Sequence, residues 1–153
     1  MGFNNPPVVK DFNINKYLGR WYEIARIDYR YEKGLDNVTA VYSLRKDGLV
    51  RVDNKGFDTK KRKWRESIGK AKFRGSKTEG SLKVSFFLFF YAGYNIVFLD
   101  DHYLYALVAG DSEKYLWILS REKTIPATIR TKFLEHAEKL GYETNKLIWV
   151  EQG

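Results

Sequence analysis

Cysteine is absent from this chain, and proline, histidine and methionine are rare: three, two and one among 153 residues. Without cysteine there can be no disulfide framework, no thiolate metal site and no cysteine nucleophile. His102 and His136 are not spaced as metal ligands usually are, and we interpret both as surface residues. No apolar run is long enough to cross a bilayer as a helix. The sequence therefore predicts neither a metal nor a cofactor.

Catalytic motifs are missing as well. The chain has no phosphate-binding glycine loop and no G-x-S-x-G turn. Asp100 and Asp101 are adjacent, so on a strand they would face opposite ways, and we interpret them as turn residues rather than as an acid pair. We therefore expect a protein that is not an enzyme.

Basic residues exceed acidic ones. The chain carries 27 Lys and Arg against 19 Asp and Glu, a formal net charge of +8. This balance favours acidic partners such as anionic lipid headgroups. We interpret the densest cluster, "KKRK" at 60–63, as a solvated hairpin turn, because no recognition helix carries the charge. We therefore expect no nucleic-acid partner.

The first residues offer no targeting signal. "MGFNNPPVVKDF" has no basic region followed by an apolar core, so it does not read as a secretory signal. Two expectations stay open: the protein is made for the cytosol, or a signal has been removed.

Alternating apolar and polar residues dominate the chain from about residue 20 to 121 and predict eight antiparallel strands. In "NVTAVYSL", for example, Val38, Ala40 and Tyr42 share one face. The "RKDG" that follows is a strong hairpin signal. After Pro126 the apolar spacing changes to three and four, which predicts a helix over about 126–140. "KLIWVEQ" predicts a short edge strand over about 146–151.

The strands must bury one face. One helix cannot cover eight strands, so we predict a closed sheet, which has no free edges and encloses either packed side chains or one small ligand. Small residues on the inward faces favour a partly empty interior. The prediction is a single domain over residues 1–153 that is all-β with one C-terminal helix, built as an eight-stranded up-and-down antiparallel β-barrel.

Two short motifs bracket the predicted barrel. "GRW" at Gly19–Trp21 opens the first strand, and "LSR" at Leu119–Arg121 closes the last one. With the strands between them, the sequence resembles the lipocalin family over essentially its whole length. Stretches such as "GRWYEIAR", "GYNIVFLDD" and "YLWILSR" are most similar to bacterial outer-membrane lipocalins and their plant temperature-induced and apolipoprotein D relatives. The third family signal is loose here, reading "LDDHY" at Leu99–Tyr103.

The resemblance implies a role for the bracketing motifs. Trp21 would point into the closed end of the barrel, Arg121 would lie against its indole, and Gly19 would let the chain pass closely beneath. A guanidinium on a tryptophan face contributes about 0.5 to 2 kcal/mol. We therefore interpret Gly19, Trp21 and Arg121 as the structural base of the barrel.

Ligand-binding candidates share the inward parity and combine small with aromatic side chains. We expect a ligand cavity lined by Ala25, Ala40, Tyr42, Val52, Phe73, Val84, Phe86, Val108, Tyr115 and Trp117. The alternative is that these residues simply fill the barrel. Glu23 has the same parity, where burial would raise its pKa, and we expect it to pair with an interior arginine or a tyrosine. Glu23 would then either contact the ligand or have a structural role near the base of the barrel.

These features predict the binding and the transport or storage of a hydrophobic ligand, above all a fatty acid or lysophospholipid, near a membrane. The alternatives are a compact ligand such as a tetrapyrrole or isoprenoid, a lipocalin-type isomerase, and a filled barrel that binds other proteins. The apolar run Phe87–Tyr91 predicts a rim that meets a membrane surface or the second subunit of a homodimer. The resemblance implies a lipid-anchored precursor on the periplasmic side of a bacterial outer membrane; a cytoplasmic protein is the alternative.

Overall fold

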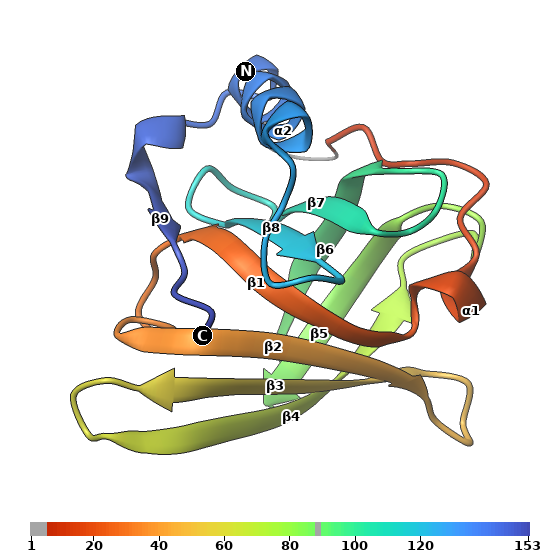
Figure 1. The fold of residues 1–153 in the computed structure, drawn as a ribbon. Helices are drawn as coiled ribbons and strands as arrows, with labels where there is room; N and C mark the ends of the chain where they lie inside the picture. The colour runs from red at the N-terminus through yellow and green to blue at the C-terminus, as the bar shows by residue number, and fades with distance from the viewer. Residues whose placement is uncertain (1–5, 88–89) are drawn as a thin grey trace.

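Eight strands wrap into a closed barrel in the computed structural model, which describes residues 6–87 and 90–153 (Figure 1). The strands are β1 (Gly19–Ile27), β2 (Leu35–Leu44), β3 (Val50–Asp58), β4 (Lys63–Phe73), β5 (Ser81–Phe87), β6 (Phe90–Leu99), β7 (Tyr105–Ala109) and β8 (Leu116–Ser120). Strand β1 pairs antiparallel with both β2 and β8, and this closes the barrel. The predicted eight-stranded antiparallel barrel is confirmed. Of the rim predicted at Phe87–Tyr91, residues 88–89 lie outside the described residues.

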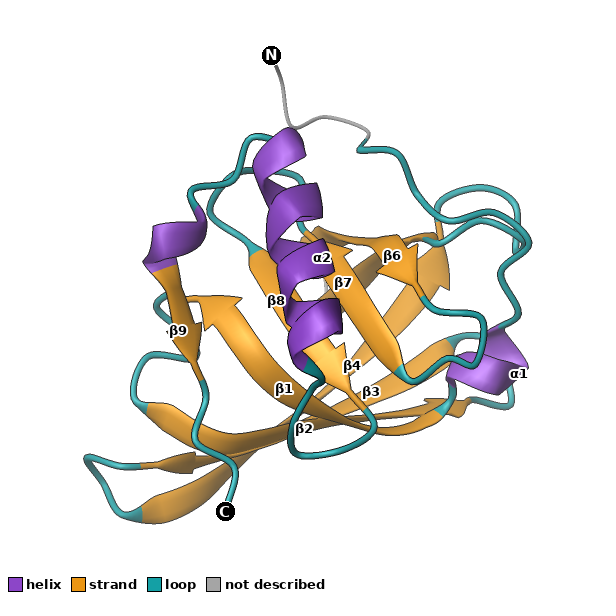
Figure 2. Cartoon of the chain, turned by 45° about the horizontal axis from the view of Figure 1, so that its top comes forward, coloured by secondary structure: helices purple, strands orange, loops and turns teal. Residues whose placement is uncertain are grey.

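A helix covers one side of the barrel from outside. Helix α2 (Ala127–Lys139) lies across β7 and β8 (Figure 2). Its buried side chains, Phe133 and Ala137, belong to a cluster that includes Leu107 and Ile118 from the strands beneath. The predicted C-terminal helix is confirmed, and it buries the outer face of these strands.

Shorter elements complete the chain. A single 3-10 turn, η1 (Thr144–Lys146), leads into β9 (Leu147–Trp149), which pairs antiparallel with the end of β1. Near the N-terminus, α1 (Ile14–Tyr17) makes one helical turn, and Asn13 caps it by accepting a hydrogen bond from the Asn15 backbone N–H at 3.0 Å. The sequence did not predict α1, because four residues are too few to show a helical period.

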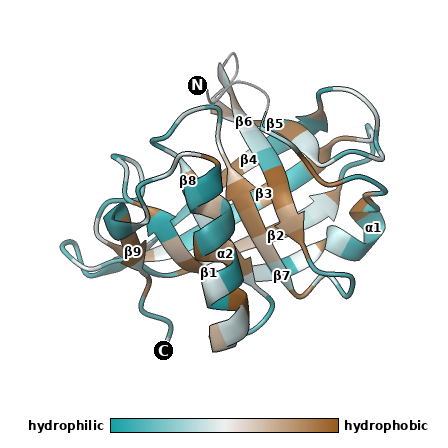
Figure 3. Ribbon diagram, turned by 90° about the horizontal axis from the view of Figure 1, so that it is seen from above, coloured by the Kyte–Doolittle hydropathy of each residue, from teal (hydrophilic) through white to brown (hydrophobic). Residues whose placement is uncertain are grey.

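The hydrophobic core has two layers, one inside the barrel and one between the barrel and α2. Trp21, Val52 and Val108 belong to the inner layer, whereas Ile24 and Leu116 belong to the outer one. Hydrophobic residues accordingly concentrate on the strands, and the connecting loops are mostly hydrophilic (Figure 3). The sheet is therefore apolar on both faces where α2 covers it.

A β-bulge in β1 reverses the parity of this strand midway. Glu23 pairs with Leu119 and Ala25 with Ile118, so Ile24 is an extra residue between two consecutive partners. Ala25 consequently faces outward and belongs to the layer under α2. This corrects the prediction that Ala25 lines the interior: the bulge breaks the alternation on which that prediction rested. Arg26 turns inward instead.

The closed end of the barrel is held by Arg121. Its guanidinium lies 4.0 Å from the centre of the Trp21 ring and donates hydrogen bonds to the backbone oxygens of Lys16, Arg20 and Tyr103 at 2.9 to 3.1 Å. Trp21 is fully buried. Gly19 has a φ of +100°, and a Cβ there would lie 3.3 Å from Arg121 Nη1. Arg121 thus ties α1, β1 and the β6–β7 turn together beneath the barrel.

We expect Arg121→Ala to lower the free energy of unfolding by about 2 to 4 kcal/mol, because it removes the stacked cation and three charge-assisted hydrogen bonds. Urea unfolding followed by circular dichroism measures the loss. Lys123→Ala, which removes an exposed charge two residues further on, is the control and should change stability by less than about 0.5 kcal/mol. Similar values for the two variants would contradict a structural role of Arg121.

Candidate functional site

Most of the predicted lining residues meet inside the barrel. Ala40, Tyr42, Val52 and Val108 are buried in the inner layer, and four others are partly buried against it: Phe73, Val84, Phe86 and Trp117. Tyr115 lies at the open end, where its ring stacks on Trp117 at 6.2 Å between ring centres and is 37% exposed. Their role in ligand binding stays a prediction. Ala25 does not join them.

Aromatic side chains fill the deep end of the barrel. The Tyr94 hydroxyl lies 2.7 Å from the hydroxyls of both Tyr17 and Tyr42, so all three groups are hydrogen-bonded. Burial raises the pKa of each of these tyrosines, which keeps the hydroxyls protonated. The cavity beside them measures about 10 Å³, no more than one water molecule needs. The partly empty interior predicted from small side chains is therefore not found at this end, because Phe12 and Tyr17 enter it from the N-terminal segment.

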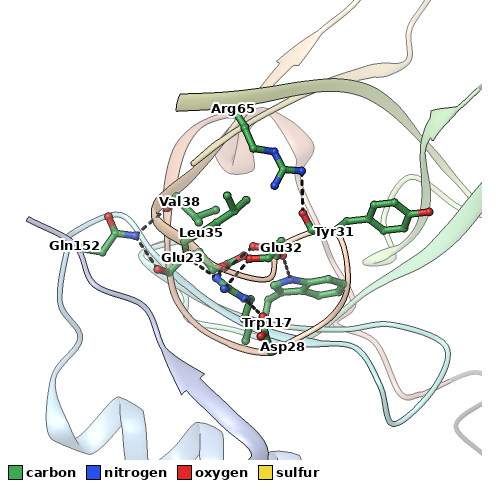
Figure 4. A network of polar contacts seen from close by, with 10 residues as sticks. Glu23, Asp28, Tyr31, Glu32, Leu35, Val38, Arg65, Trp117 and Gln152 are labelled. Atoms are coloured by element: carbon green, nitrogen blue, oxygen red, sulfur yellow. Dashed lines mark hydrogen bonds and ion pairs between the residues drawn. The ribbon is translucent and has the colours of Figure 1, made fainter. Parts of the chain in front are cut away.

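A buried arginine dominates the open end. The Arg26 side chain is 3% exposed, and its Nη1 lies 3.0 Å from Glu23 Oε2 while its Nε lies 2.9 Å from Asp28 Oδ1. Nη1 also donates to the Leu35 backbone oxygen, and Nη2 donates to that of Glu32 (Figure 4). The expected pairing of Glu23 with an interior arginine is thus present. The bulge in β1 makes it geometrically feasible, because it turns both side chains inward.

The loop between β1 and β2 bends into the mouth of the barrel. Its Glu32 side chain is 12% exposed, and Glu32 Oε1 accepts a hydrogen bond from Trp117 Nε1 at 2.9 Å (Figure 4). Tyr29 packs edge-on against Trp117 and Tyr115 at 5.9 and 5.5 Å between ring centres. The loop, which we define as residues 28–34 and call the mouth loop, therefore covers the opening from the β8 side.

Two carboxyl groups compete for Arg26. Burial raises the pKa of Glu23, the neighbouring Glu32 carboxylate raises it further, and Arg26 lowers it by less. Glu23 therefore retains its proton well above the pH at which a free glutamate loses it. Glu32 Oε2 lies 3.6 Å from Arg26 Nη1, too far for a hydrogen bond, and the Glu32 side chain also interacts with the Glu23 carboxyl and the Tyr29 hydroxyl.

Basic and aromatic residues surround the mouth. The turn between β3 and β4 carries Lys60–Lys63, all exposed, at the same end of the barrel as the mouth loop (Figure 1). Beside it Arg65 lies 3.5 Å from Asp58 and donates to the Tyr31 backbone oxygen at 3.4 Å. The side chains of Tyr31 and Trp64 are more than half exposed. The predicted hairpin turn at 60–63 thus borders the opening.

The histidines lie away from this site. His102 is exposed in the β6–β7 turn, and His136 lies on α2 beside the Phe98 ring. Within residues 6–87 and 90–153 there is no group of three or more His, Cys, Asp or Glu that could hold a metal ion. Nor does any helix in that part of the chain have the length and apolar character needed to span a membrane.

Sequence reasoning missed several residues that shape the interior, namely Phe12, Tyr17, Arg26, Glu32 and Tyr94. One available signal was the arginine at position 26, which interrupts an otherwise apolar stretch of β1. A charge at such a position indicates either an outward face or a buried ion pair. Deciding between them requires the position of the bulge.

Comparison with known proteins places the fold. Residues 12–152 match the family model described as a lipocalin-like domain. The chain is 52% identical to the outer membrane lipoprotein Blc of Citrobacter freundii over 145 residues, which cover 95% of this chain and 82% of that protein. The chain belongs to the lipocalin family. The predicted family is thereby confirmed.

More distant relatives of this lipocalin extend the same result. It is 35% identical to temperature-induced lipocalin-1 of Arabidopsis thaliana, over 92% of this chain and 79% of that protein. It is 34% identical to apolipoprotein D of Cavia porcellus, over 97% and 81%. The solved structure of the cockroach allergen Per a 4 superposes with a TM-score of 0.75 at 24% identity, covering 96% of this chain and 92% of that one.

The raised pKa of Glu23 predicts a pH dependence. Because the folded protein holds this proton more tightly than the unfolded chain, the stability contributed by Glu23 is full below about pH 4.3 and falls as the pH rises toward the folded-state pKa. Glu23→Gln has no proton to lose. We therefore expect the stability of Glu23→Gln, relative to the unsubstituted protein, to rise by more than about 1 kcal/mol between about pH 4 and pH 8.

Chemical unfolding at a series of pH values measures this difference. Glu66→Gln, which neutralises an exposed carboxylate on β4, is the matched control. Its stability relative to the unsubstituted protein should hardly change with pH. A flat difference for Glu23→Gln as well would mean that Glu23 is ionised like a surface glutamate.

Proposed function

We propose that this lipocalin binds an acyl lipid with an anionic head, a fatty acid or a lysophospholipid, and carries or stores it at a membrane. The observation that carries the proposal is the buried Arg26 at the mouth of a barrel whose inner layer consists mainly of hydrophobic side chains. A cation above apolar walls is complementary to a molecule with one anionic end and a hydrocarbon tail. We propose no catalytic role.

The inner layer supports the part of the proposal that concerns the tail. Val84, Phe86 and Trp117 are partly buried against this hydrophobic layer, so they offer apolar surface to a hydrocarbon chain. Each methylene moved from water into such surroundings contributes about 0.8 kcal/mol. Long acyl chains should therefore bind more tightly than short ones.

The relatives support the proposed location. Three bacterial relatives at about half identity bear the name outer membrane lipoprotein. We propose that this lipocalin works on the periplasmic side of a bacterial outer membrane, attached through a lipid on its precursor. The basic, aromatic surroundings of the mouth agree with this, since lysine and arginine are attracted to anionic headgroups and exposed tyrosine and tryptophan suit the membrane interface.

We expect the affinity for saturated fatty acids to rise by roughly fourfold per methylene over a series of chain lengths, until the barrel is full. Quenching of tryptophan emission and calorimetry measure the affinities. A flat series would overturn the acyl-chain proposal. Visible absorbance of protein purified from its own host, in place of acyl lipid in its extract, would indicate a compact pigment-like ligand.

A pair of substitutions tests whether the tail enters the barrel. Val84→Trp should weaken fatty-acid binding by about tenfold or more, because the larger ring takes up space on the inner wall. Val41→Trp places the same ring on the exposed outer face of β2 and should leave the affinity unchanged. Circular dichroism checks that both variants fold.

A second pair tests the membrane face. We expect Lys60→Gln with Lys61→Gln to weaken binding to vesicles containing phosphatidylglycerol by roughly tenfold to thirtyfold at low salt, since each basic residue near the surface contributes ~1 kcal/mol. Lys46→Gln with Lys77→Gln removes the same charge from turns at the closed end. Co-sedimentation measures binding. Equal losses from both pairs would show that net charge alone attracts the protein.

A further inference from the structure

The mouth of the barrel already holds an anion, the Glu32 side chain. Trp117 Nε1 donates to its Oε1 at 2.9 Å, and Arg26 lies 3.6 Å from its Oε2. Tyr29 lies near enough for this carboxylate to raise the pKa of its hydroxyl, after the larger effect of burial. Cation, indole and phenol thus converge on one carboxylate that comes from the chain itself.

Glu32 fills this place imperfectly. The Glu23 carboxyl and the Tyr29 hydroxyl interact with this carboxylate, but its Oε2 stays 3.6 Å from Arg26 Nη1, beyond hydrogen-bond length. The backbone explains why: the Glu32 carbonyl accepts from Arg26 Nη2 at 2.8 Å, and its N–H donates to the Tyr29 carbonyl at 3.0 Å. The main chain of Glu32 is thus held at two points, and its carboxylate reaches no closer than 3.6 Å to the guanidinium. An oxyanion without such a tether could take both donors at full hydrogen-bond length.

We propose that the anionic head of the lipid binds where the Glu32 carboxylate now lies, held by Arg26 and Trp117, and that it enters by displacing Glu32 and the mouth loop. This inference rests on the proposed function and names the head site within it. The chemistry recognised is an oxyanion, which a fatty acid supplies as a carboxylate and a lysophospholipid as a phosphate. The Glu32 carboxylate then competes with the head of the ligand for Arg26 and Trp117.

The mouth loop is built so that it can leave. Arg65 reaches its Tyr31 carbonyl only at 3.4 Å at an exposed site, and Tyr31 and Lys33 face solvent. Gly34, where the loop joins β2, has a φ of +83° and is held to Thr59 by hydrogen bonds of 2.9 and 3.0 Å. The far end of the loop is therefore anchored at Thr59, while Glu32 in its middle is held by Arg26 and Trp117.

The test compares ligands of one chain length that differ only in the head: hexadecanoic acid, hexadecanol and a sixteen-carbon lysophosphatidylethanolamine. Because the head of the acid competes with the Glu32 carboxylate for Arg26 and Trp117, whereas the alcohol has no anionic group to place there, Glu32→Gln should bind the acid roughly fivefold or more tightly than the unsubstituted protein does, and the alcohol within about twofold. Glu113→Gln, which removes an exposed charge from the β7–β8 turn, is the control and should change neither affinity.

A double-mutant cycle adds a readout that a structural effect would not produce. Trp117→Phe keeps an aromatic ring and removes the indole N–H. It therefore removes the hydrogen bond to the Glu32 carboxylate and the corresponding hydrogen bond to the head of the ligand. Its effect on acid binding should therefore be small in the presence of Glu32 and at least about threefold larger in the Glu32→Gln background. Hydrogen exchange of residues 29–33 should speed up when the acid binds and stay unchanged with the alcohol.

The outcomes separate the two proposals. If no ligand binds to the folded unsubstituted protein or to folded Glu32→Gln, the acyl-lipid function itself fails. If the lipids bind but Glu32→Gln leaves both the acid and the lysophospholipid unchanged, or strengthens them no more than the alcohol, the head site fails and the function stands. Tighter binding of the acid alone identifies a fatty acid as the source of the oxyanion, and tighter binding of the lysophospholipid alone identifies a phosphate.

Discussion

A guanidinium buried inside the mouth of the barrel determines most of what surrounds it. An isolated charge in such a place costs several kcal/mol unless it is paired and fully hydrogen-bonded. Arg26 meets this condition by pairing with Glu23 on its own strand and with Asp28 just after it, and by donating to the backbone oxygens of Glu32 and Leu35. Glu32 and Leu35 lie in the part of the chain that follows β1. The hydrogen bonds that Arg26 donates to their backbone oxygens therefore hold the mouth loop in the opening. The closed mouth is thus a consequence of the bulge that turned Arg26 inward.

The two ends of the barrel satisfy their arginines in different ways. Arg121 at the base donates to three neutral carbonyls that belong to the frame of the fold and stacks on a fully buried indole. Arg26 at the mouth faces carboxyl groups that repel one another, and this repulsion helps to keep a proton on Glu23. Because the partners of Arg121 are neutral backbone carbonyls that belong to the frame of the fold, the base of the barrel stays closed. Anionic partners on a loop make the mouth exchangeable, because another oxyanion offers the same chemistry.

The barrel and its helix could be predicted from the sequence, since alternation of side chains and a change of period are properties of short stretches. The interior could be predicted only in part. Alternation assigned Ala40 and Val52 correctly to the inner layer, but it failed at Ala25, where one extra residue in β1 exchanges inward and outward faces. Phe12 and Tyr17 enter from outside the strands, so no strand pattern reveals them. Arg26 and Glu32 meet only because the bulge and the loop act together.

The hydrogen bonds of the interior also decide how a ligand would lie. At the base, the hydroxyls of Tyr17, Tyr42 and Tyr94 satisfy one another, and the remaining space is about 10 Å³. A polar head placed there would have to break these bonds before it made its own. At the mouth, by contrast, Arg26 and Trp117 share a carboxylate whose Oε2 stays 3.6 Å from Arg26 Nη1, beyond hydrogen-bond length. A lipid that enters with its head last therefore leaves the base intact and improves the hydrogen bonding of the mouth, whereas the reverse orientation would disturb both ends.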